Sequence, residues 1–488
     1  MALLSLSNNV TWNLIFAIFA ASFGSAFQHG YNTGVLNPIR DLTTELIQKC
    51  KAGEEGCKFK VSDMNVIWGI LVGIFCIGGM IGGLLVSYAA EQLGRKYALL
   101  ANNFFVFLGA CLMALETTVD SWVIFAAGRL VIGIACGLGA GLTPLYLQEI
   151  APSSIEGAVG IVYQLILTMA ILFSEIMGHK HVLGFAKGWP YLIALTVIPG
   201  IIQLVTLPHC PDSPKYLIIE RDRLEKGRKG LAWLRGQIDN EEEIYRYRQE
   251  KEDERELGVV YLKTLFTRSD LRTPLIVSVM LMLAQQLCGI NVIIYFSTTV
   301  FKSAGLSEQT SQYATIGMGV TNVLGAVISI FIIERVGRKS LLAFGFVGML
   351  LSTGGLFLCL LRNLREDEPP NEMIGKLSIF FVLTFTVCFA VGPGPIPWFI
   401  VSELFTQQVR PLASSIAVAV NWLANFVVGL SFPSLNEKIG AYVFVIFIVF
   451  QAFFLAFILF VVEDKTKKEE PRRQQRPDPA PEEHDDKV

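Results

Sequence analysis

Twelve stretches of this chain, each at least 18 residues long, contain no Asp, Glu, Lys or Arg. A bilayer core is crossed by a helix of about 20 apolar residues, whereas the strands of a membrane barrel are about 10 residues long and alternate in polarity. We therefore predict an all-α membrane protein with 12 transmembrane helices. The uncharged stretches are residues 1–39, 64–90, 97–115, 130–148, 157–174, 188–211, 273–301, 309–333, 340–361, 377–402, 411–436 and 439–462.

A charged segment divides the predicted helices into two sets of six. Residues 209–271 carry 13 basic and 14 acidic residues, and opposite charges three and four positions apart favour helices there. Pro and charged residues dominate the end of the chain, which predicts disorder. The predicted units are an N-terminal six-helix half (1–208), a helical cytoplasmic linker (209–271), a C-terminal six-helix half (272–463) and a disordered cytoplasmic tail (464–488).

The orientation follows from the span count and from the cations. An even number of spans places both termini and the linker on one side of the membrane. The linker and the tail hold most of the Lys and Arg residues on that side, although its short loops hold few. Because cytoplasmic segments are enriched in Lys and Arg, we expect both termini to be cytoplasmic.

A repeated motif relates the two halves. The pattern E-x-x-G-R-K occurs at Glu91–Lys96, after the second span, and at Glu334–Lys339, after the eighth. A second echo follows the fourth and tenth spans, at Glu149 and Glu403. Duplicated halves are typical of transporters that rock about a central site.

Several function classes are disfavoured by the sequence. A formal net charge of −2 gives no field that would attract nucleic acid. Phosphate-binding G-x-x-x-x-G-K-[ST], H-E-x-x-H and paired C-x-x-C motifs do not occur. We therefore predict that the protein is not an enzyme and uses no metal ion or cofactor. Transport would run on gradients, because a linker of about 60 residues is too short for a nucleotide-binding domain.

Neutral amides are the main polar groups inside the predicted spans. A buried amide is costly unless it is paired, and a lone one usually joins two helices. Here Gln285, Gln286 and Asn291 lie within two helical turns. Both halves contribute further amides, at Gln164, Asn322, Asn421 and Asn425. Amides donate and accept hydrogen bonds without charge, and Trp398 and Trp422 add flat apolar faces, so we predict a sugar or polyol substrate.

The sequence Gly-Pro-Gly-Pro-Ile-Pro at 392–397 cannot remain a regular helix. Prolines such as Pro393 and Pro395 remove backbone donors and clash with the preceding turn. Within a membrane such a break is tolerated beside a cavity or at a hinge buried in protein. We predict a moving gate element next to the substrate site.

Longer motifs add more specific information. They are QHGYNTGVLNP, GRLVIGIACG, PDSPKYL, QQLCGINVIIYFST, YATIGMGVTN, IERVGRK, VGPGPIPWFIVSELF and NWLANFVVGLSFP. These motifs, spread over roughly residues 12–465, resemble the facilitative hexose transporters of animals, in the sugar porter branch of the major facilitator superfamily. The resemblance implies the major facilitator fold and hexose uniport by alternating access across the plasma membrane. The hexose it implies is glucose, with fructose as an alternative.

The resemblance also assigns roles to individual residues. The implied sugar contacts are Gln164, Gln285, Gln286, Asn291, Asn322, Trp398 and Asn421. Tyr295 matches the extracellular gate region. The implied cytoplasmic salt-bridge network is Arg95, Glu149, Glu334, Arg338, Glu403 and Arg410, with Glu403 and Arg410 as a retained pair.

Some positions depart from the family pattern. Relatives have an arginine where this chain has Glu156, so the partner expected for Glu149 becomes a second acid. We expect either a weaker latch in the first half or recruitment of Arg95 or Lys96 by both carboxylates. Many glucose-type relatives have a glutamate in place of Ala390, and Gln-Leu-Ser in place of 282–284, so exclusive glucose selectivity does not follow.

Acidic residues within the predicted spans indicate whether transport is coupled to protons. Proton-driven relatives have an acid in the first span, where this chain has Asn32, and this favours uniport. The remaining candidate is Glu175, eleven residues after Gln164, which we expect near the exofacial end as a solvated carboxylate. A proton–sugar symporter is the first alternative. A transporter-like nutrient sensor is the second, although the tail is short for a signalling domain.

Cys50 and Cys57 lie in the predicted extracellular loop between the first two spans. An oxidising exterior permits a disulfide between them, and the sequence leaves the disulfide and two free thiols as equal alternatives. The sequence predicts no oligomeric state.

Overall fold

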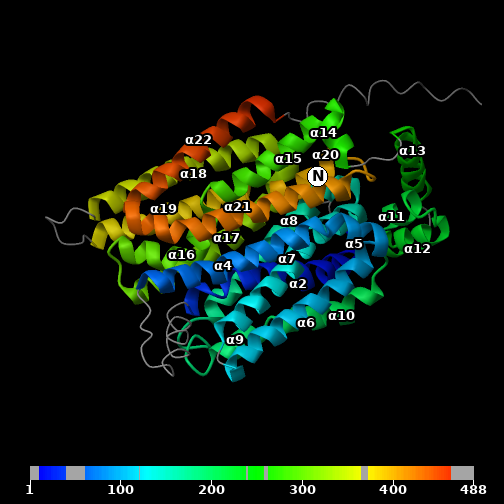
Figure 1. The fold of residues 1–488 in the computed structure, drawn as a ribbon. Helices are drawn as coiled ribbons and strands as arrows, with labels where there is room; N and C mark the ends of the chain where they lie inside the picture. Colours follow the sequence, from blue (N-terminus) through cyan, green and yellow to red (C-terminus); the bar gives the residue numbers. More distant parts are fainter. Residues whose placement is uncertain are drawn as a thin grey trace, which may run out of the picture.

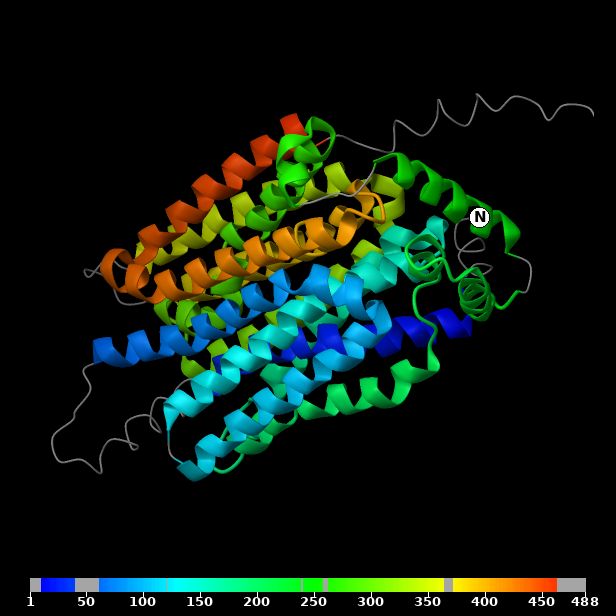
Figure 2. The ribbon, with the colours of Figure 1, turned by 45° about the vertical axis from the view of Figure 1, so that its right-hand side comes forward.

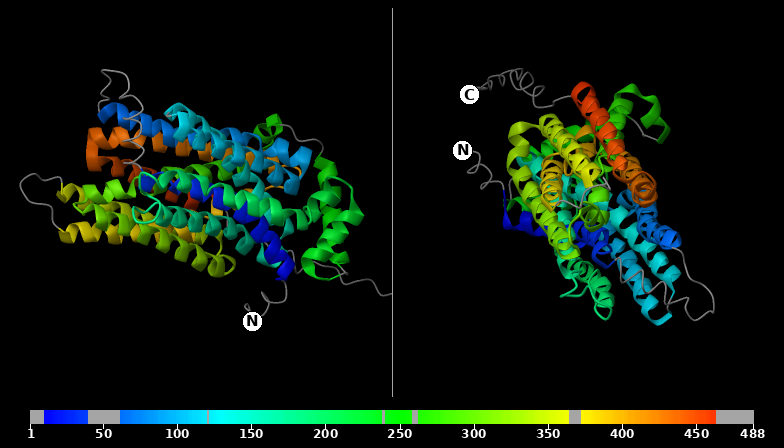
Figure 3. Two further views of the ribbon diagram at one scale, coloured as in Figure 1. Left: turned by 90° about the horizontal axis from the view of Figure 1, so that it is seen from below. Right: turned by 90° about the vertical axis from the view of Figure 1, so that its left-hand side faces the viewer.

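A computed structural model describes residues 10–39, 61–119, 121–237, 240–257, 262–363 and 372–462. Cys50, Cys57 and the predicted tail lie outside the described residues. The regular elements of the described part are helices, and the long ones run along one axis (Figure 1). Three short helices, α11–α13, gather at one end of the bundle (Figure 2). We call this the linker end and the opposite one the distal end; Figure 3 shows the bundle from below and from the distal end.

The N-terminal half is drawn in blue to green, and the C-terminal half in green to red (Figure 1). The N-terminal helices are α2 (Trp12–Gly34), η1 (Asn37–Ile39), α4 (Val61–Leu84), α5 (Val86–Leu93), α6 (Arg95–Val119), α7 (Trp122–Ile150), η2 (Ser153–Ile155), α8 (Glu156–Met177), α9 (Trp189–Ala194), α10 (Val197–Thr206) and η3 (Leu207–His209). The C-terminal helices are α15 (Ser269–Leu287), α16 (Ile290–Ser303), α17 (Glu308–Val336), α18 (Arg338–Asn363), α19 (Glu372–Val391), α20 (Ile396–Leu404), α21 (Arg410–Ile439), η4 (Gly440–Tyr442) and α22 (Val443–Val461).

The number of spans agrees with the sequence in most respects. Ten stretches of described helix are long and apolar enough to cross a membrane, and the last of them, Arg410–Val461, contains both α21 and α22. Helix α2 has 23 residues, or about 34 Å at 1.5 Å per residue. Its second half carries Gln28, His29 and Asn32, which lower its hydropathy. The predicted count of twelve is reached when Arg410–Val461 is counted as two spans and α2 is added to the ten stretches.

The two halves meet along several pairs of helices, of which α4 with α21 and α8 with α17 are the most extensive. Helix α4 packs against α21, α8 against α17, and α7 against α20. Within the N-terminal half, α4 and α7 approach closely because both carry glycines at the contact. A Cβ atom on Gly137 would lie 2.0 Å from the carbonyl oxygen of Gly79, so a larger residue would force the helices apart.

Four helices make up the charged linker: α11 (Pro214–Ile219), α12 (Leu224–Arg235), α13 (Glu241–Leu257) and α14 (Leu262–Thr267). The N-terminus of α2 is tied to α12. Thr11 caps α2 by accepting from the N–H of Leu14 and donates to the carbonyl oxygen of Leu234 at 2.5 Å, and Asn13 donates to the carbonyl oxygen of Trp233 at 2.8 Å. The linker is therefore docked on the N-terminal half.

An ion pair fixes the start of α13. Arg235 donates to both oxygens of Glu243, at 2.8 and 3.1 Å, and the Tyr247 hydroxyl donates to the same carboxylate at 2.7 Å. Burial acts to raise the pKa of Glu243, but the hydrogen bonds and charge of Arg235 and the bond from Tyr247 outweigh it, so the pKa lies below its ordinary value.

Candidate functional site

Four of the predicted amides form one hydrogen-bonded cluster at the junction of α15 and α16. Gln286 donates to Oδ1 of Asn421 at 2.8 Å, Asn421 donates to Oε1 of Gln285 at 2.8 Å, and Asn291 donates to Oε1 of Gln286. The helix is interrupted at Gly289, whose φ of +97° suits a residue without a Cβ. All four amides are buried. Because they satisfy one another, a ligand rich in hydroxyls can exchange these bonds for its own.

The predicted break at 392–397 is observed between α19 and α20, and it lies against the amide cluster. Proline has no N–H, so the carbonyl oxygens of Val391 and Pro393 lose the helical partners that residues 395 and 397 would otherwise supply. Ser329 donates to the carbonyl oxygen of Val391 at 2.7 Å. Gln285 donates to the carbonyl oxygens of Gly394 at 2.6 Å and of Pro393 at 3.4 Å. A change in the cluster is thus transmitted to the broken helix.

Two tryptophans form an aromatic wall with His29 of α2. The Trp422 ring lies 4.8 Å from the His29 ring, and the Trp398 ring meets His29 edge-on at 6.0 Å. Tyr163 of α8 holds the histidine through a 2.8 Å hydrogen bond between its hydroxyl and Nδ1, and its ring lies 5.4 Å from Trp398. The Trp422 indole N–H has no hydrogen-bond partner within the described residues, which leaves a donor for a ligand. The wall joins both halves.

Gln164 and Asn322 are buried but lie outside the hydrogen-bonded cluster. They belong to α8 and α17, which pack together across the interface between the halves. Within the described part, Oδ1 of Asn322 has no hydrogen-bond partner. A buried acceptor without a partner is costly, and a hydroxyl group of a ligand would satisfy it.

Tyr295, the predicted gate residue, lies one turn beyond Asn291 toward the distal end. Its hydroxyl donates to Oδ1 of Asn425 on α21 at 3.3 Å. Further along α16, Asn37 of η1 donates to the hydroxyl of Ser297 at 3.2 Å and so links the halves. The Asn37–Ser297 contact, which crosses the interface between the halves, is polar and uncharged.

Charged contacts dominate the linker end. Arg95 donates to Oε1 of Glu149 at 2.9 Å and to both oxygens of Glu220, at 2.5 and 3.2 Å. Burial raises the pKa of Glu220, and the charge and hydrogen bonds of Arg95 oppose this shift. The expected recruitment of Arg95 or Lys96 by Glu156 is wrong. Arg95 has Glu220 as its second acid, and the Lys96 ammonium donates to the carbonyl oxygens of residues 208 and 210.

Gln407 carries the linker-end network across the interface. From the loop before α21, its Nε2 donates to Oε1 of Glu149 at 2.5 Å and to Oε1 of Glu220 at 3.1 Å. Its Oε1 accepts from Arg410 at 3.1 Å. The side chain of Gln407 is fully buried, so these bonds exist only while the linker end is closed.

The second half supplies another contact between the halves. Arg338 donates to Glu403 at 2.8 Å and to Glu334 at 3.2 Å, so the acid that we expected to pair with Arg410 pairs here with Arg338. Glu334 also accepts from the N–H of Ala158, at the N-terminus of α8, at 3.3 Å. A carboxylate is favourable at that end of a helix.

Glu220 and Gln407 were missed by the sequence reasoning. Glu220 belongs to the linker, where acids and bases nearly balance, so nothing separated it from its solvated neighbours. Gln407 lies in a short polar loop and carries no charge. The one available signal was its position between the predicted network residues Glu403 and Arg410.

The structure also places Ala390, a departure from the family pattern, and Glu175, the candidate for proton coupling. Ala390 is buried and faces Gly325 of α17. A Cβ atom added to Gly325 would lie 2.7 Å from the Cβ atom of Ala390. Glu175 was expected to be solvated, and this was wrong. Its side chain is buried at the distal end of α8, and neither of its oxygens has a hydrogen-bond partner among the described residues. No group of three or more His, Cys, Asp or Glu suited to a metal ion is found in that part of the chain.

Comparison with known proteins gives consistent matches over nearly the whole chain. A sequence model of the family described as "Sugar (and other) transporter" matches residues 17–470. Human solute carrier family 2, facilitated glucose transporter member 3, is 40% identical over 458 residues, covering 94% of this chain and 91% of that protein. Member 4 from mouse is 39% identical over 464 residues, covering 93% and 89%.

Solved structures match the fold. The proton:xylose symporter XylE bound to 6-bromo-6-deoxy-D-glucose superimposes with a TM-score of 0.80 at 24% identity, covering 93% of this chain and 96% of that one. A partially occluded inward-open form of XylE from E. coli gives a TM-score of 0.75 at 22% identity, covering 93% and 99%.

Proposed function

Since the chain belongs to the sugar transporter family, we propose that it is a facilitative uniporter that moves hexose down its gradient by alternating access. The observation that carries this proposal is the buried amide cluster of Gln285, Gln286, Asn291 and Asn421 beside two tryptophans. Its groups are uncharged, offer donors and acceptors together, and lie beside apolar rings. A pyranose presents hydroxyls at its edge and C–H groups on its faces, and it matches both features.

The substrate preference in this proposal is glucose. The facilitated glucose transporters among the relatives support it, and Trp398 supplies the broad face that a pyranose requires. Ala390 cannot supply the polar contact that a glutamate at this position would give, so we expect fructose to compete with glucose to some degree. Gln164 and Asn322 would complete the sugar contacts from α8 and α17.

Alternating access is supported by the two sets of contacts between the halves. Charged groups and Gln407 join the halves at the linker end, and the hydrogen bond between Asn37 and Ser297 and the ring contact between His179 and Tyr313 join them at the distal end. Opening one set while the other stays closed exposes the amide cluster to one side. We place the linker end and both termini in the cytoplasm, and the protein in the plasma membrane. Tyr295 and the break containing Pro393 and Pro395 would move during opening.

The surroundings of Asn32 support uniport over symport. The position where proton-driven relatives have an acid holds an amide that donates to Thr196 at 2.8 Å and to the carbonyl oxygen of Gln28 at 3.0 Å. Arg129 of α7 donates to the backbone oxygen of Asn32 at 2.9 Å, and its guanidinium lies 4.2 Å from the Phe75 ring centre. This arginine therefore has neutral partners at the position where a proton carrier would sit.

Transport by the purified protein in liposomes tests the proposal. Labelled glucose should enter until the concentrations inside and outside are equal, and a proton uncoupler should leave the uptake unchanged. Accumulation above the outside concentration that collapses with the uncoupler would instead establish a proton–sugar symporter. Binding of glucose without any uptake would indicate a sensor. Unlabelled fructose added to the same vesicles measures the selectivity.

A further inference from the structure

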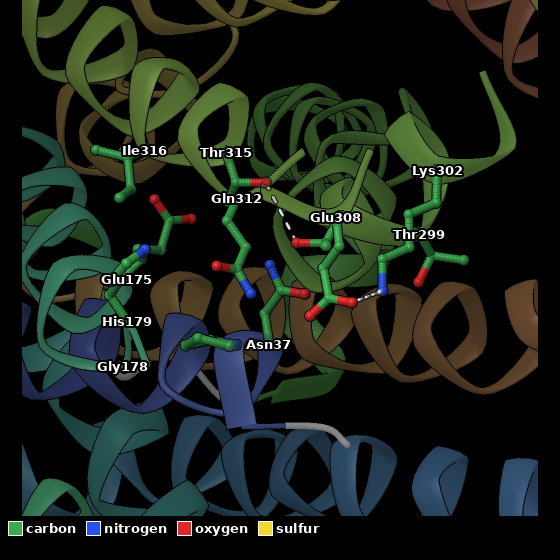
Figure 4. A pocket seen from close by; sticks show the side chains of 12 residues that line it. Asn37, Glu175, Gly178, His179, Thr299, Lys302, Glu308, Gln312, Thr315 and Ile316 are labelled. Atoms are coloured by element: carbon green, nitrogen blue, oxygen red, sulfur yellow. Dashed lines mark hydrogen bonds and ion pairs between the residues drawn. The ribbon is translucent and has the colours of Figure 1, made fainter. Parts of the chain in front are cut away.

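A separate cavity lies between the halves at the distal end, away from the amide cluster (Figure 4). Its volume is about 80 Å³, enough for a few water molecules. The ends of α8 and α16, the start of α17 and the turn after α2 line it. The polar lining residues that matter are Asn37, Glu175 and His179 from the N-terminal half and Lys302, Glu308 and Gln312 from the C-terminal half.

Glu175 is the unusual member of this lining. It is 3% exposed, and neither oxygen has a hydrogen-bond partner within the described residues. On α17 across the interface, a Cβ atom at Gly319 would lie 2.8 Å from Oε2 of Glu175, so the two helices are in close contact there. The Oε1 atom of Gln312, on the same cavity, is also buried without a partner. Nε2 of His179, which lines the same cavity, is likewise buried without a partner, and no donor of the described residues lies within hydrogen-bond distance of either oxygen of Glu175.

Neither the Lys302 ammonium nor the His179 ring neutralises the charge of the Glu175 carboxylate. Lys302 of α16 pairs with Glu308 of α17 at 3.6 Å, and both side chains are largely exposed at the rim. Burial, and then the charges of His181 and Lys180, lower the pKa of His179, so its ring is neutral near pH 7.

Among the described residues, the remaining elements around Glu175 supply no cation. The turn after α2 contributes Asn37 and Pro38 to the cavity lining, and α2 itself contains no Lys or Arg. Arg129 of α7 is directed at the backbone of Asn32. An ionised carboxylate that neither pairs with a cation nor accepts a hydrogen bond is strongly disfavoured in such a place, whereas a protonated one carries no charge and gains an O–H donor.

We propose that Glu175 binds a proton whenever the distal end of the interface closes around it, and releases that proton to the same side when the end opens. In the closed state a carboxylate and a hydronium ion become a carboxyl group and water. The proposal rests on the uniport function and on the cytoplasmic placement of the linker end. Exofacial closure then becomes a pH-sensitive step of transport.

The proton does not cross the membrane in this scheme. Glu175 lies eleven residues beyond Gln164 on α8, or about 16 Å further toward the distal end. The amide cluster and the aromatic wall lie on the cytoplasmic side of it. While the linker end is open, the distal end remains closed and retains the proton, so the proton returns to the outside. The sugar flux depends on external pH without being driven by a proton gradient.

The experiment measures zero-trans glucose influx into liposomes, with the protein oriented outside-out, the interior held at pH 7.5 and the exterior varied from about pH 5.5 to 8.5. For the natural chain, influx should fall as the external pH rises, by at most about tenfold per pH unit, the limit for one proton. Glu175→Gln resembles the protonated form and should give influx that is high and independent of external pH. The control Glu308→Gln removes the exposed acid of the same cavity and should keep the natural pH dependence.

Each outcome is decisive. Influx of the natural chain that is flat across the range, or a slope that survives in Glu175→Gln, would overturn the proposal. A pH-sensitive dye in the vesicle lumen shows whether the proton crosses the membrane. Acidification of the lumen together with sugar entry would mean that the protein is a proton–sugar symporter and that the proton does not return to the outside. Influx that depends on the external Na⁺ concentration at constant pH would indicate that Glu175 binds a metal cation and not a proton. Absence of uptake at every pH would contradict the transport function itself, and a single symmetric peak in size-exclusion chromatography confirms that each variant is folded.

Discussion

Replacing Gln407 by alanine should open the linker end, because this side chain joins the halves only in the closed state. Its Nε2 donates to Glu149 at 2.5 Å and to Glu220 at 3.1 Å, and its Oε1 accepts from Arg410 at 3.1 Å. A hydrogen bond to a charged group contributes about 1.5–3 kcal/mol. Since the three bonds share one side chain, we count two at the lower value, or about 3 kcal/mol. This corresponds to a shift of about 100-fold toward the state in which the linker end is open.

Hydrogen–deuterium exchange measures this shift directly. The N–H of Ala158 donates to Glu334 across the same interface, so peptides covering 153–160 and 403–412 should exchange faster in Gln407→Ala, by up to the same factor when exchange follows opening. Gln92→Ala is the matched control, because Gln92 is exposed at the same end of the bundle and its side chain does not cross the interface. Equal exchange rates in both variants and the natural chain would refute the role of Gln407 as a latch.

Three further predictions follow from local contacts. Gln286→Ala should weaken glucose binding about tenfold or more, since buried groups of the cluster lose their partner; calorimetric titration that gives an unchanged affinity would contradict this. Gly79→Ala should reduce transport strongly, because the added Cβ would lie 2.2 Å from the Trp422 ring, whereas Gly317→Ala, which meets nothing within 4 Å, should be neutral in the same uptake assay. The pKa of Glu243 is lowered in the folded linker, so its contribution to stability is present above the unfolded value of about 4.3 and is lost as the pH falls through the folded pKa; Glu243→Gln should therefore make α13 more sensitive to trypsin at neutral pH, whereas cleavage by pepsin in acid should not distinguish the variant from the natural chain.

The sequence predicted those features that follow from polarity and from proline chemistry. Uncharged stretches located the helices, and residues 392–397 had to interrupt one of them because proline lacks an N–H. The break at Gly289 was not anticipated, since a single glycine within an apolar helix is common. This break matters because it allows the Asn291 side chain to reach Gln286. On a continuous helix, two residues five positions apart would point in different directions.

Partner choice among charged residues could not be predicted. The repeat indicated that Arg95 and Arg338 lie at equivalent loop positions, but their partners depend on how the linker docks. Arg95 is paired with Glu220 because α11 lies beneath it, and a position in a charged segment does not reveal such docking. The burial of Glu175 likewise depends on the contact between α8 and α17. Distance along a helix predicted its depth but not whether the neighbouring half would cover it.

The two ends of the interface between the halves are closed by different chemistry, and this difference determines how each end responds to its surroundings. At the linker end the carboxylates of the buried Glu149 and the half-buried Glu220 share the guanidinium of Arg95 and the amide donor of Gln407. The distal end encloses Glu175 without either. Closing the linker end therefore brings the amide of Gln407 onto carboxylates that Arg95 already pairs, whereas closing the distal end covers a carboxyl group that has no partner among the described residues. On the proposal made above, a transporter built in this way responds to acidity at its distal end through Glu175, and to substitution of the paired side chains at its linker end.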